Sequence, residues 1–320
     1  MKILPSLLCL VLQCLAASAL AADRMTLCLN WSPGADHAPL YFARSEGWFA
    51  DAGLAATLVP GGGSVDALSR LGRGECDAAV ADFGAVQVSP THDNAPVAVM
   101  AIVSESPLAF LSGRTAPLRG LEDLRGARIA ADPNELARRL WPYLLALNGK
   151  EDLTVTWVDA PNNSKVDALL TGRADVAAST FYHHVLEFES AFGDRLRSLA
   201  WRDLGVNPYG NVLVFARRTI AESPRQVART VEIVQRAYAA CVRAASPCLD
   251  ALLAANSHLD GAVEASKWRL VSPLIAPPRR RGETLGTFEE NRIRATAKRA
   301  EVPAGPRWTN EFLSTAHVIP

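Results

Sequence analysis

The hydrophobic positions of the chain alternate between short apolar runs and longer stretches with helical spacing. Apolar runs at 27–29, 54–59 and 77–80 predict strands, and the segments between them repeat apolar residues every three or four positions, as a helix does. The junctions Ser32-Pro33-Gly34 and Pro60-Gly61-Gly62-Gly63-Ser64 carry residues typical of turns. Strands that alternate with helices predict a parallel sheet flanked by helices.

A second copy of this pattern decides the predicted architecture. The run Val-Asp-Ala-Leu at 65–68, with Gly-x-x-Asp at 74–77, returns at 166–169 with Gly-x-x-Asp at 172–175. Upstream of the second copy a strand, a helix and a strand are predicted in the same order as before, at 128–131, 134–147 and 153–158. The repeat therefore predicts an α/β fold with two lobes, each a parallel-rich sheet flanked by helices, with a ligand cleft between them.

The remaining apolar strands indicate where the chain passes between the lobes. Runs at 97–103, 108–112 and 211–216 are strand-like, and we expect crossings near 104–112 and 205–212. The predicted boundaries are 22–108 and 212–320 for lobe 1, which is discontinuous, and 109–211 for lobe 2.

The C-terminal part is predicted to be helical. Ser223-Pro224 is a helix start, and the apolar stripe that follows it is interpreted as core rather than a cofactor site. The stripe consists of Val227, Val231, Val234 and Tyr238. Further helices are expected at 248–255 and 263–274. Arg279-Arg280-Arg281 is interpreted as a solvated loop, with a basic patch for a partner protein as the alternative.

Length and charge are consistent with two lobes that bind a small molecule. The chain has 320 residues, with 33 basic and 33 acidic side chains, so a nucleic-acid or anionic-membrane partner is not expected. Lys2, the mostly apolar stretch 3–20 and the small-x-small site Ala19-Leu20-Ala21 predict a signal peptide, 1–21, cleaved after Ala21. An uncleaved membrane anchor is the alternative. We expect a periplasmic monomer.

Four cysteines remain after that cleavage, in a compartment that is oxidising. Cys241 and Cys248 flank Ser246-Pro247, and either a small disulfide-closed loop or two free thiols fits their spacing. Cys28 and Cys76 are interpreted as buried thiols. The sequence has no CxxC and no Cys/His ligand spacing.

The loop after the first strand and the glycine-rich turn carry candidate binding residues. Trp31, Asp36 and His37 lie in or beside that loop, and ligands of open α/β sheets bind where strands end and helices begin. Gly63 and Ser64 precede the next helix, where backbone N–H groups can approach a polar ligand and Ser64 is a natural N-cap. The structural alternatives are a polar turn with a core tryptophan and a plain tight turn.

Signals for catalysis are weak, and we predict no catalytic residues, no metal and no cofactor. The run Gly62-Gly63-Ser64-Val65-Asp66 lacks the final glycine of a hydrolase nucleophile motif. His183-His184 with Glu187 suggests a metal site, but adjacent histidines on a helix point about 100° apart, so at most one of them joins Glu187. A solvent-facing polar helix is the preferred interpretation.

At this point the residues resemble a known family, the periplasmic solute-binding proteins of ABC importers, in the branch for thiamine-pyrimidine precursors, sulfonates and nitrate-like solutes. The motifs that carry the resemblance are Asn30-Trp31-x-Pro33, His37-Ala38-Pro39-Leu40-Tyr41-Phe42-Ala43, Glu46-Gly47-Trp48-Phe49, Gly53-Leu54, the two repeats, Tyr209-Gly210-Asn211-Val212-Leu213-Val214-Phe215 and Trp308-Thr309-Asn310-Glu311-Phe312-Leu313. They cover most of the chain after residue 21.

The resemblance implies a type II-like periplasmic binding fold that closes on a solute and delivers it to a permease in the inner membrane. By the same resemblance, Trp31 stacks on the solute, and the other ligand-binding residues line the two walls of the cleft. These are Asp36, His37, Asp82 and Phe83 on the first lobe, Asn134, Glu135, Phe181 and Tyr182 on the second, and Tyr209 and Asn211 by the return crossing.

One departure from the family pattern concerns the solute. Precursor-binding relatives have a glutamate just after the second repeat, where this chain has Ser179-Thr180-Phe181-Tyr182. Phe and Tyr offer stacking or a hydroxyl instead of a carboxylate. We therefore expect a small planar polar solute, with a thiamine pyrimidine precursor or related heterocycle as the best guess. The alternatives are a sulfonate, nitrate or aromatic-acid binding protein, a pyrimidine-forming enzyme of the same fold, or a solute sensor.

Overall fold

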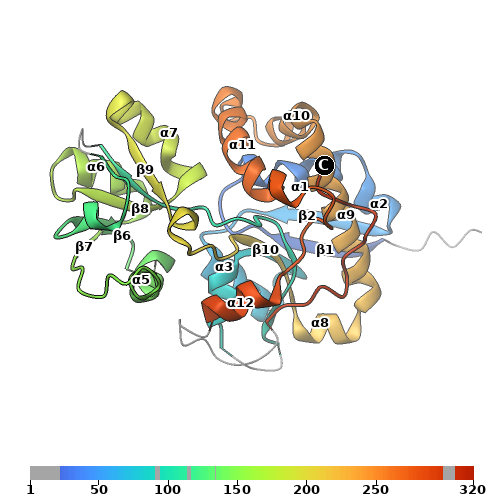
Figure 1. Ribbon diagram of the computed structural model, residues 1–320. Helices are drawn as coiled ribbons and strands as arrows, with labels where there is room; N and C mark the ends of the chain where they lie inside the picture. The colour runs from blue at the N-terminus through green and yellow to red at the C-terminus, as the bar shows by residue number, and fades with distance from the viewer. Residues whose placement is uncertain (1–21, 91–93, 114–116, 134, 298–306) are drawn as a thin grey trace, which may run out of the picture.

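The computed structural model describes residues 22–90, 94–113, 117–133, 135–297 and 307–320. The predicted signal peptide 1–21, with its cleavage after Ala21, lies outside the described residues, as do His92 and Asn134. Two five-stranded sheets are flanked by helices and form two lobes (Figure 1). The predicted two-lobed α/β fold is confirmed.

The first sheet has the strand order β2-β1-β3-β10-β4. Its strands are β1 (Asp23–Cys28), β2 (Leu54–Val59), β3 (Ala78–Asp82), β4 (Pro96–Ala101) and β10 (Asn211–Ala216). The first three run parallel, and β10 pairs antiparallel with both β3 and β4. The return strand β10 therefore inserts between two strands that precede it by more than a hundred residues in the chain.

The second sheet repeats this arrangement, with the order β7-β6-β8-β5-β9. Its strands are β5 (Leu108–Ser112), β6 (Arg128–Ala131), β7 (Thr156–Asp159), β8 (Val176–Thr180) and β9 (Arg197–Ala200). Here β6, β7 and β8 run parallel, and β5 pairs antiparallel with β8 and β9, as β10 does in the first sheet. The repeat in the sequence is therefore a repeat of topology, while the exact lobe boundaries stay a prediction.

The repeated aspartates explain why the motif recurs. The Asp77 carboxylate accepts a hydrogen bond from the backbone N–H of Thr26 at 2.7 Å, and the Asp175 carboxylate accepts one from Arg128 at 2.9 Å. In both cases the residue before the third strand is tied to the strand that pairs with it in parallel, to the middle of β1 in the first lobe and to the start of β6 in the second. The alanines of the motif, Ala67 and Ala168, are fully buried, which lets each helix lie close on its sheet. The motif is structural.

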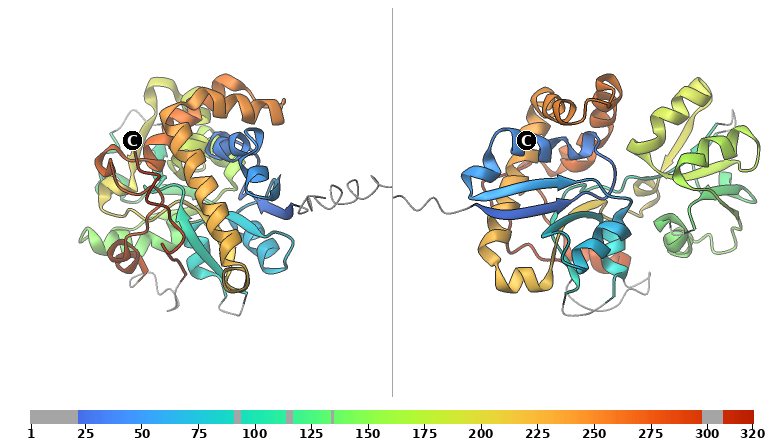
Figure 2. Two further views of the ribbon diagram at one scale, coloured as in Figure 1. Left: turned by 90° about the vertical axis from the view of Figure 1, so that its right-hand side faces the viewer. Right: turned by 180° about the vertical axis from the view of Figure 1, so that it is seen from behind.

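Helices cover both faces of each sheet. They are α1 (Ala38–Ser45), α2 (Trp48–Asp51), α3 (Ser64–Gly72), α4 (Phe83–Val88), α5 (Leu136–Leu147), α6 (Lys165–Leu170), α7 (Phe181–Phe192), α8 (Arg217–Glu222), α9 (Pro224–Arg243), α10 (Ala245–Ala255), α11 (Gly261–Ile275) and α12 (Glu290–Ala297). Figure 2 shows the long α9 lying across the first lobe. Its predicted stripe is buried and joins the first-lobe core, which confirms that interpretation.

Alternate residues of the central strands feed two separate apolar layers. In β10, Leu213 and Phe215 belong to one buried cluster, while Val212 and Val214 belong to the cluster on the opposite face. The second lobe divides in the same way across β5. Each lobe is thus a sheet with a core on either face, as expected for strands that are buried on both sides.

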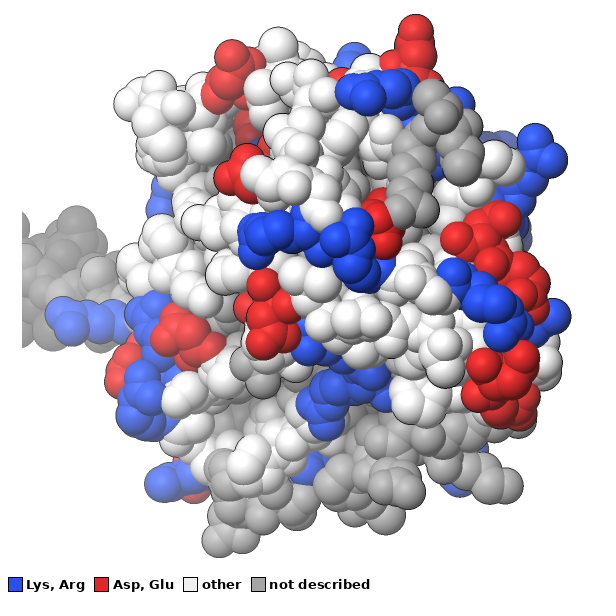
Figure 3. All heavy atoms as spheres, turned by 90° about the vertical axis from the view of Figure 1, so that its left-hand side faces the viewer, with Lys and Arg blue, Asp and Glu red and all other residues white. Residues whose placement is uncertain are grey.

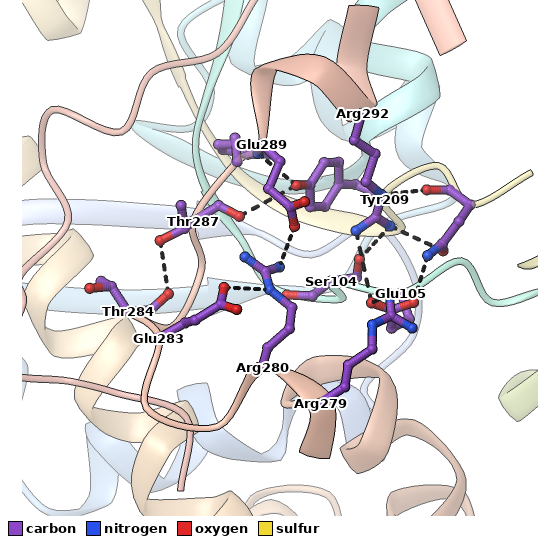
Figure 4. A network of polar contacts seen from close by, with 12 residues as sticks. Ser104, Glu105, Tyr209, Arg279, Arg280, Glu283, Thr284, Thr287, Glu289 and Arg292 are labelled. Atoms are coloured by element: carbon purple, nitrogen blue, oxygen red, sulfur yellow. Dashed lines mark hydrogen bonds and ion pairs between the residues drawn. The ribbon is translucent and has the colours of Figure 1, made fainter. Parts of the chain in front are cut away.

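The two crossing segments lie side by side and are held to the first lobe (Figure 4). The backbone N–H of Ser106 donates to Oδ1 of Asn207 at 2.6 Å, and Nδ2 of Asn207 donates to Oε2 of Glu105 at 2.6 Å. From α12, the Arg292 guanidinium donates to the carbonyls of Ser104 and Asn207, each at 2.5 Å. One arginine, only 14% exposed in its side chain, therefore fixes both crossings at one point.

The interpretation of 279–281 as a solvated loop is wrong for Arg280, while Arg279 and Arg281 are exposed. Arg280 is only 5% exposed, and its guanidinium pairs with Glu283 at 2.8 Å and Glu289 at 3.2 Å. Arg279 is more exposed, but it donates to the buried Glu105 of the first crossing at 2.7 Å. Sequence reasoning missed this because Glu105 and Glu289 lie on other segments, although Glu283 is only three residues from Arg280.

Both cysteine pairs are disulfides. Cys28 with Cys76 and Cys241 with Cys248 each have Cα atoms 5.9 Å apart. The expectation of buried thiols at Cys28 and Cys76 is therefore wrong. Cys28 ends β1 and Cys76 precedes β3, which pairs with β1, so only the order of strands in the sheet brings the two together. Cys241–Cys248 joins α9 to α10.

The outer surface of the second lobe carries both signs of charge. Figure 3 shows acidic and basic side chains interspersed in small groups on the face turned away from the first lobe. Within the described ranges, no helix combines the length and the apolar composition that a membrane-spanning segment requires.

Candidate functional site

A closed ring of four polar side chains lies where the first sheet ends. His37 Nε2 lies 2.9 Å from Oδ1 of Asn30, Nδ2 of Asn30 donates to Oδ1 of Asn211 at 3.2 Å, and Nδ2 of Asn211 donates to Oδ2 of Asp36 at 3.2 Å. The ring closes because His37 Nδ1 lies 3.6 Å from Oδ1 of Asp36. All four residues are nearly or fully buried. We call Asn30, Asp36, His37 and Asn211 the polar ring.

The ends of two strands and a short 3-10 helix bring these four side chains together. Asn30 follows β1, Asp36 and His37 form the short 3-10 helix at Ala35–His37, and Asn211 opens β10. Two further contacts fix the loop: Tyr238 of α9 donates to the Asp36 carbonyl at 2.7 Å, and the Ala35 N–H donates to Glu264 of α11 at 2.6 Å. The candidate loop is thus held rigidly from beneath.

His37 Nδ1 is buried without a hydrogen-bond partner among the described residues. If Nε2 carries the proton and donates to Asn30, Nδ1 presents a lone pair towards the Asp36 carboxylate. Two acceptors then face each other across 3.6 Å, which leaves the polar ring with an acceptor at His37 Nδ1 that no described residue satisfies.

The second lobe reaches this ring through one side chain. Tyr182, at the start of α7, donates its hydroxyl to Oδ2 of Asp36 at 3.5 Å and accepts from Nδ2 of Asn211 at 3.4 Å. It is only 2% exposed, and it packs in the hydrophobic cluster of the first lobe. Burial, reinforced by the charge of Asp36, raises the pKa of Tyr182 well above its usual value, so the phenol stays protonated and is available as a donor.

Trp31 stands beside the ring as an exposed aromatic surface. It is 43% exposed, the only aromatic side chain of the described residues with such a large exposed fraction. Its backbone carbonyl accepts from the N–H of Gly61 at 3.3 Å, and a Cβ at Gly61 would come within 2.0 Å of the Leu29 carbonyl. Glycine at that position is what allows the glycine-rich turn to lie against the Trp31 loop.

Asp82 adds a second carboxylate to this edge of the sheet. Its Oδ1 accepts from the N–H groups of Gly84 at 2.8 Å and Ala85 at 3.4 Å, capping α4. Burial raises the Asp82 pKa to about 6, against the lowering effect of those two hydrogen bonds. Asp82 also raises the pKa of Tyr182, which places the two groups in each other's electrostatic range.

The glycine-rich turn differs from the prediction in which residue caps the helix. Gly63, with φ at +130°, is the N-cap of α3, and Ser64 is its first residue. The expectation that Ser64 caps the helix is therefore wrong: its hydroxyl instead accepts from the backbone N–H of Asp82 at 2.9 Å. The turn supports the Asp82 position and thereby the edge of the site.

Phe83 and Tyr209 are packed in the hydrophobic core of the first lobe. Their rings are 5.8 Å apart, and both contact Phe288. The Tyr209 hydroxyl accepts from the Glu289 N–H at 2.8 Å, and the Arg292 guanidinium lies over its ring (Figure 4). The structure brings them to the crossing region but not to the polar ring.

The second-lobe wall contains a buried ion pair. Lys165 is fully buried, and its ammonium contacts both oxygens of Glu135 at 2.8 and 2.6 Å. Glu135 precedes α5, and Lys165 begins α6, so both lie at the end of the sheet that faces the first lobe. Burial raises the Glu135 pKa although Lys165 lowers it. Phe181 packs against the second-lobe core, and Asn134 lies outside the described residues.

The structure adds residues that sequence reasoning did not place in the site. Asn30 belongs to a quoted motif, but only the sheet shows that it bonds Asn211. Tyr238 is part of the α9 stripe that is interpreted as core. Its ring is buried there, but its hydroxyl also supports the site by donating to the Asp36 carbonyl. Among the described residues no group of three or more His, Cys, Asp or Glu side chains is arranged to hold a metal ion, and His184 instead lies 2.8 Å from the Ser179 hydroxyl.

Comparison with known families assigns this chain. The model of the family described as NMT1/THI5-like matches residues 34–245, which include the 3-10 helix of the polar ring, both repeats and all of α9. The chain belongs to the NMT1/THI5-like family. A comparison with curated protein sequences gives no significant match.

Solved structures share the fold of this NMT1/THI5-like chain at low sequence identity. The alkanesulfonate-binding protein SsuA of Xanthomonas axonopodis pv. citri, bound to MOPS, is 18% identical with a TM-score of 0.63, covering 87% of this chain and 91% of that one. The aliphatic sulphonate binding protein SsuA of Escherichia coli is 15% identical with a TM-score of 0.64, covering 87% and 86%. A ligand-binding component of an ABC-type import system of Staphylococcus aureus is 12% identical with a TM-score of 0.67, covering 92% and 99%.

Proposed function

We propose that this protein is the exported, non-enzymatic solute-binding component of an ABC importer. It captures a small planar polar solute between its two lobes and delivers it to a permease in the inner membrane. The observation that carries the proposal is the polar ring at the end of the first sheet, which the second lobe contacts through Tyr182. Family membership and the two-lobed fold support it.

The chemistry of the first-lobe wall favours a solute that carries N–H donors. Asp36 and Asp82 supply two carboxylates, which accept hydrogen bonds and repel anions. An aminopyrimidine or a related heterocycle has the donors that these groups require and a flat face for Trp31. A sulfonate or nitrate is the second candidate, because similar folds include the sulfonate-binding SsuA proteins.

The disulfides support export. Both pairs are buried, and structural disulfides persist in oxidising compartments such as the periplasm. The predicted signal peptide agrees with this assignment, and cleavage after Ala21 stays part of the proposal. A sensor that presents the solute to a membrane receptor has the same binding chemistry; neighbouring genes for a permease and an ATPase would favour import.

The proposal is tested first by identifying what the protein binds. Mass spectrometry of the gently purified protein before and after denaturation should release a planar solute, and incubation with it should return it unchanged. Titration calorimetry with 4-aminopyrimidine derivatives and with MOPS should show binding of the former and much weaker binding of the latter. Turnover of the solute would refute the non-enzymatic assignment, and preference for MOPS would refute the solute class.

Trp31→Ala tests the stacking surface. Loss of about 1.4 kcal/mol of aromatic contact weakens binding roughly tenfold, without unfolding, because the side chain is substantially exposed. The matched control is Trp48→Ala, since Trp48 packs against Phe42 and Arg236 on the first lobe away from the polar ring. An unchanged Kd for Trp31→Ala would remove this residue from the site.

A further inference from the structure

Tyr182 belongs to the second lobe in sequence, but its side chain packs in the hydrophobic core of the first lobe. It is the second residue of α7, which follows β8 directly, yet it packs with the buried residues of the first lobe rather than with those of the second. The helix that follows packs against α11 of the first lobe. Figure 1 shows α7 and α11 next to one another where the lobes meet. Separating the lobes therefore withdraws this ring from an apolar environment.

The hydroxyl of Tyr182 contacts two members of the polar ring, one as a donor and the other as an acceptor. It donates to Asp36 and accepts from Asn211. Asp36 is itself held through its backbone by Tyr238, and Asn211 is held by Asn30, so neither group follows Tyr182 when the lobe moves. Opening breaks both hydrogen bonds in one step.

We propose that Tyr182 is a closure latch: its hydroxyl enters the polar ring only when the lobes are closed, and this contact stabilises the closed state independently of solute. The inference adds to the proposed function by assigning the coupling between the site and lobe closure to one residue. A solute that also contacts the second lobe then shifts an equilibrium that is already biased towards closure. Such a latch increases apparent affinity because a larger fraction of the protein is competent to hold solute.

The test measures the distance between the lobes in protein without solute. p-Acetylphenylalanine at the exposed positions Val65 and Leu170 carries two dyes for single-molecule energy transfer and leaves the four cysteines in their disulfides. Tyr182→Phe, which removes only the hydroxyl, should lower the ratio of closed to open molecules about fivefold, because its two hydrogen bonds are long and together contribute about as much as one well-formed buried bond. Tyr41→Phe is the matched control, because Tyr41 is buried entirely within the first lobe, and it should leave the ratio unchanged.

A double-mutant cycle distinguishes a latch from general destabilisation. Asp36→Ala removes the acceptor, so adding Tyr182→Phe to it should lower the ratio by clearly less than the fivefold seen alone. An unchanged ratio in Tyr182→Phe, or additive effects in the cycle, would overturn the latch. So would tighter solute binding by Tyr182→Phe, since a group that blocks the site behaves in that way. The distance measurement needs no solute, so it decides the latch even if the proposed function fails.

Discussion

The two disulfides should contribute unequally to stability, by an amount that follows from the loops they close. Cys28–Cys76 joins residues 48 apart in sequence, whereas Cys241–Cys248 joins residues only 7 apart. Loop-closure entropy in the unfolded chain then gives a stabilisation of about 4 kcal/mol for the long loop and about 2.4 kcal/mol for the short one. The double variant Cys28→Ala/Cys76→Ala should therefore lose about 1.7 kcal/mol more stability than Cys241→Ala/Cys248→Ala.

The two double variants can be compared directly because all four cysteine side chains are buried to a similar extent. Each cysteine is at most 5% exposed, so replacement by alanine removes a similar apolar contact in both double variants. The contact loss largely cancels in the difference, which leaves the loop term. Urea denaturation followed by circular dichroism, with and without a reducing agent, measures the free energy of unfolding of each variant.

Two outcomes would refute this reasoning. One is an equal loss in both double variants, which would mean that the reduced, unfolded chain retains the contacts between these segments. The other is a larger loss for Cys241→Ala/Cys248→Ala, which would mean that the α9–α10 junction depends on its bond enthalpically. A reducing agent should destabilise the native protein and should have no effect on a variant that lacks all four cysteines.

The remaining predictions concern the first-lobe edge of the site. Asp82 has a folded pKa of about 6, above its ordinary value of 3.8, so its contribution to stability is complete below about pH 4 and is lost as the pH rises through 6. Asp82→Asn should flatten that decline, measured by urea denaturation between pH 4 and 7; an unchanged pH profile would contradict the burial of this carboxyl. Gly84→Ala should disfavour closure, because the added Cβ would lie 2.8 Å from Leu136 of the opposite lobe. The energy-transfer pair should show more open molecules, and an unchanged distribution would mean that Leu136 moves aside.

The strands and their repetition could be predicted from the sequence because they depend on local periodicity. The strands at 108–112, 128–131 and 211–216 begin and end where the hydrophobic pattern indicates, and Pro224 begins α9 as expected. The Cys28–Cys76 bond and the Arg279–Glu105 ion pair depend instead on which segments become neighbours in space. No local pattern encodes such neighbours.

In the candidate site, too, the sequence predicts some features, whereas others depend on packing. Asp36, His37 and Asn211 do meet at the end of the first sheet, and Tyr182 reaches them from the other lobe, as expected for residues at strand ends. Phe83 is also at a strand end, but its ring turns into the core, since direction depends on the helix that follows it. The sequence indicates which residues are near the edge, whereas packing decides which of them face it.

The contacts that hold the two crossing segments together have a consequence for the order in which the lobes fold. Pairing β4 with β10 requires closing a loop of roughly 110 residues. Once the second lobe is folded, its two ends lie together, as the 2.6 Å contact between Ser106 and Asn207 shows, and the loop that remains to be closed is effectively about ten residues long. The closure cost then falls by about 2 kcal/mol. The first sheet therefore gains its return strand most readily after the inserted lobe has formed, so a mutation that delays folding of the second lobe also delays completion of the first.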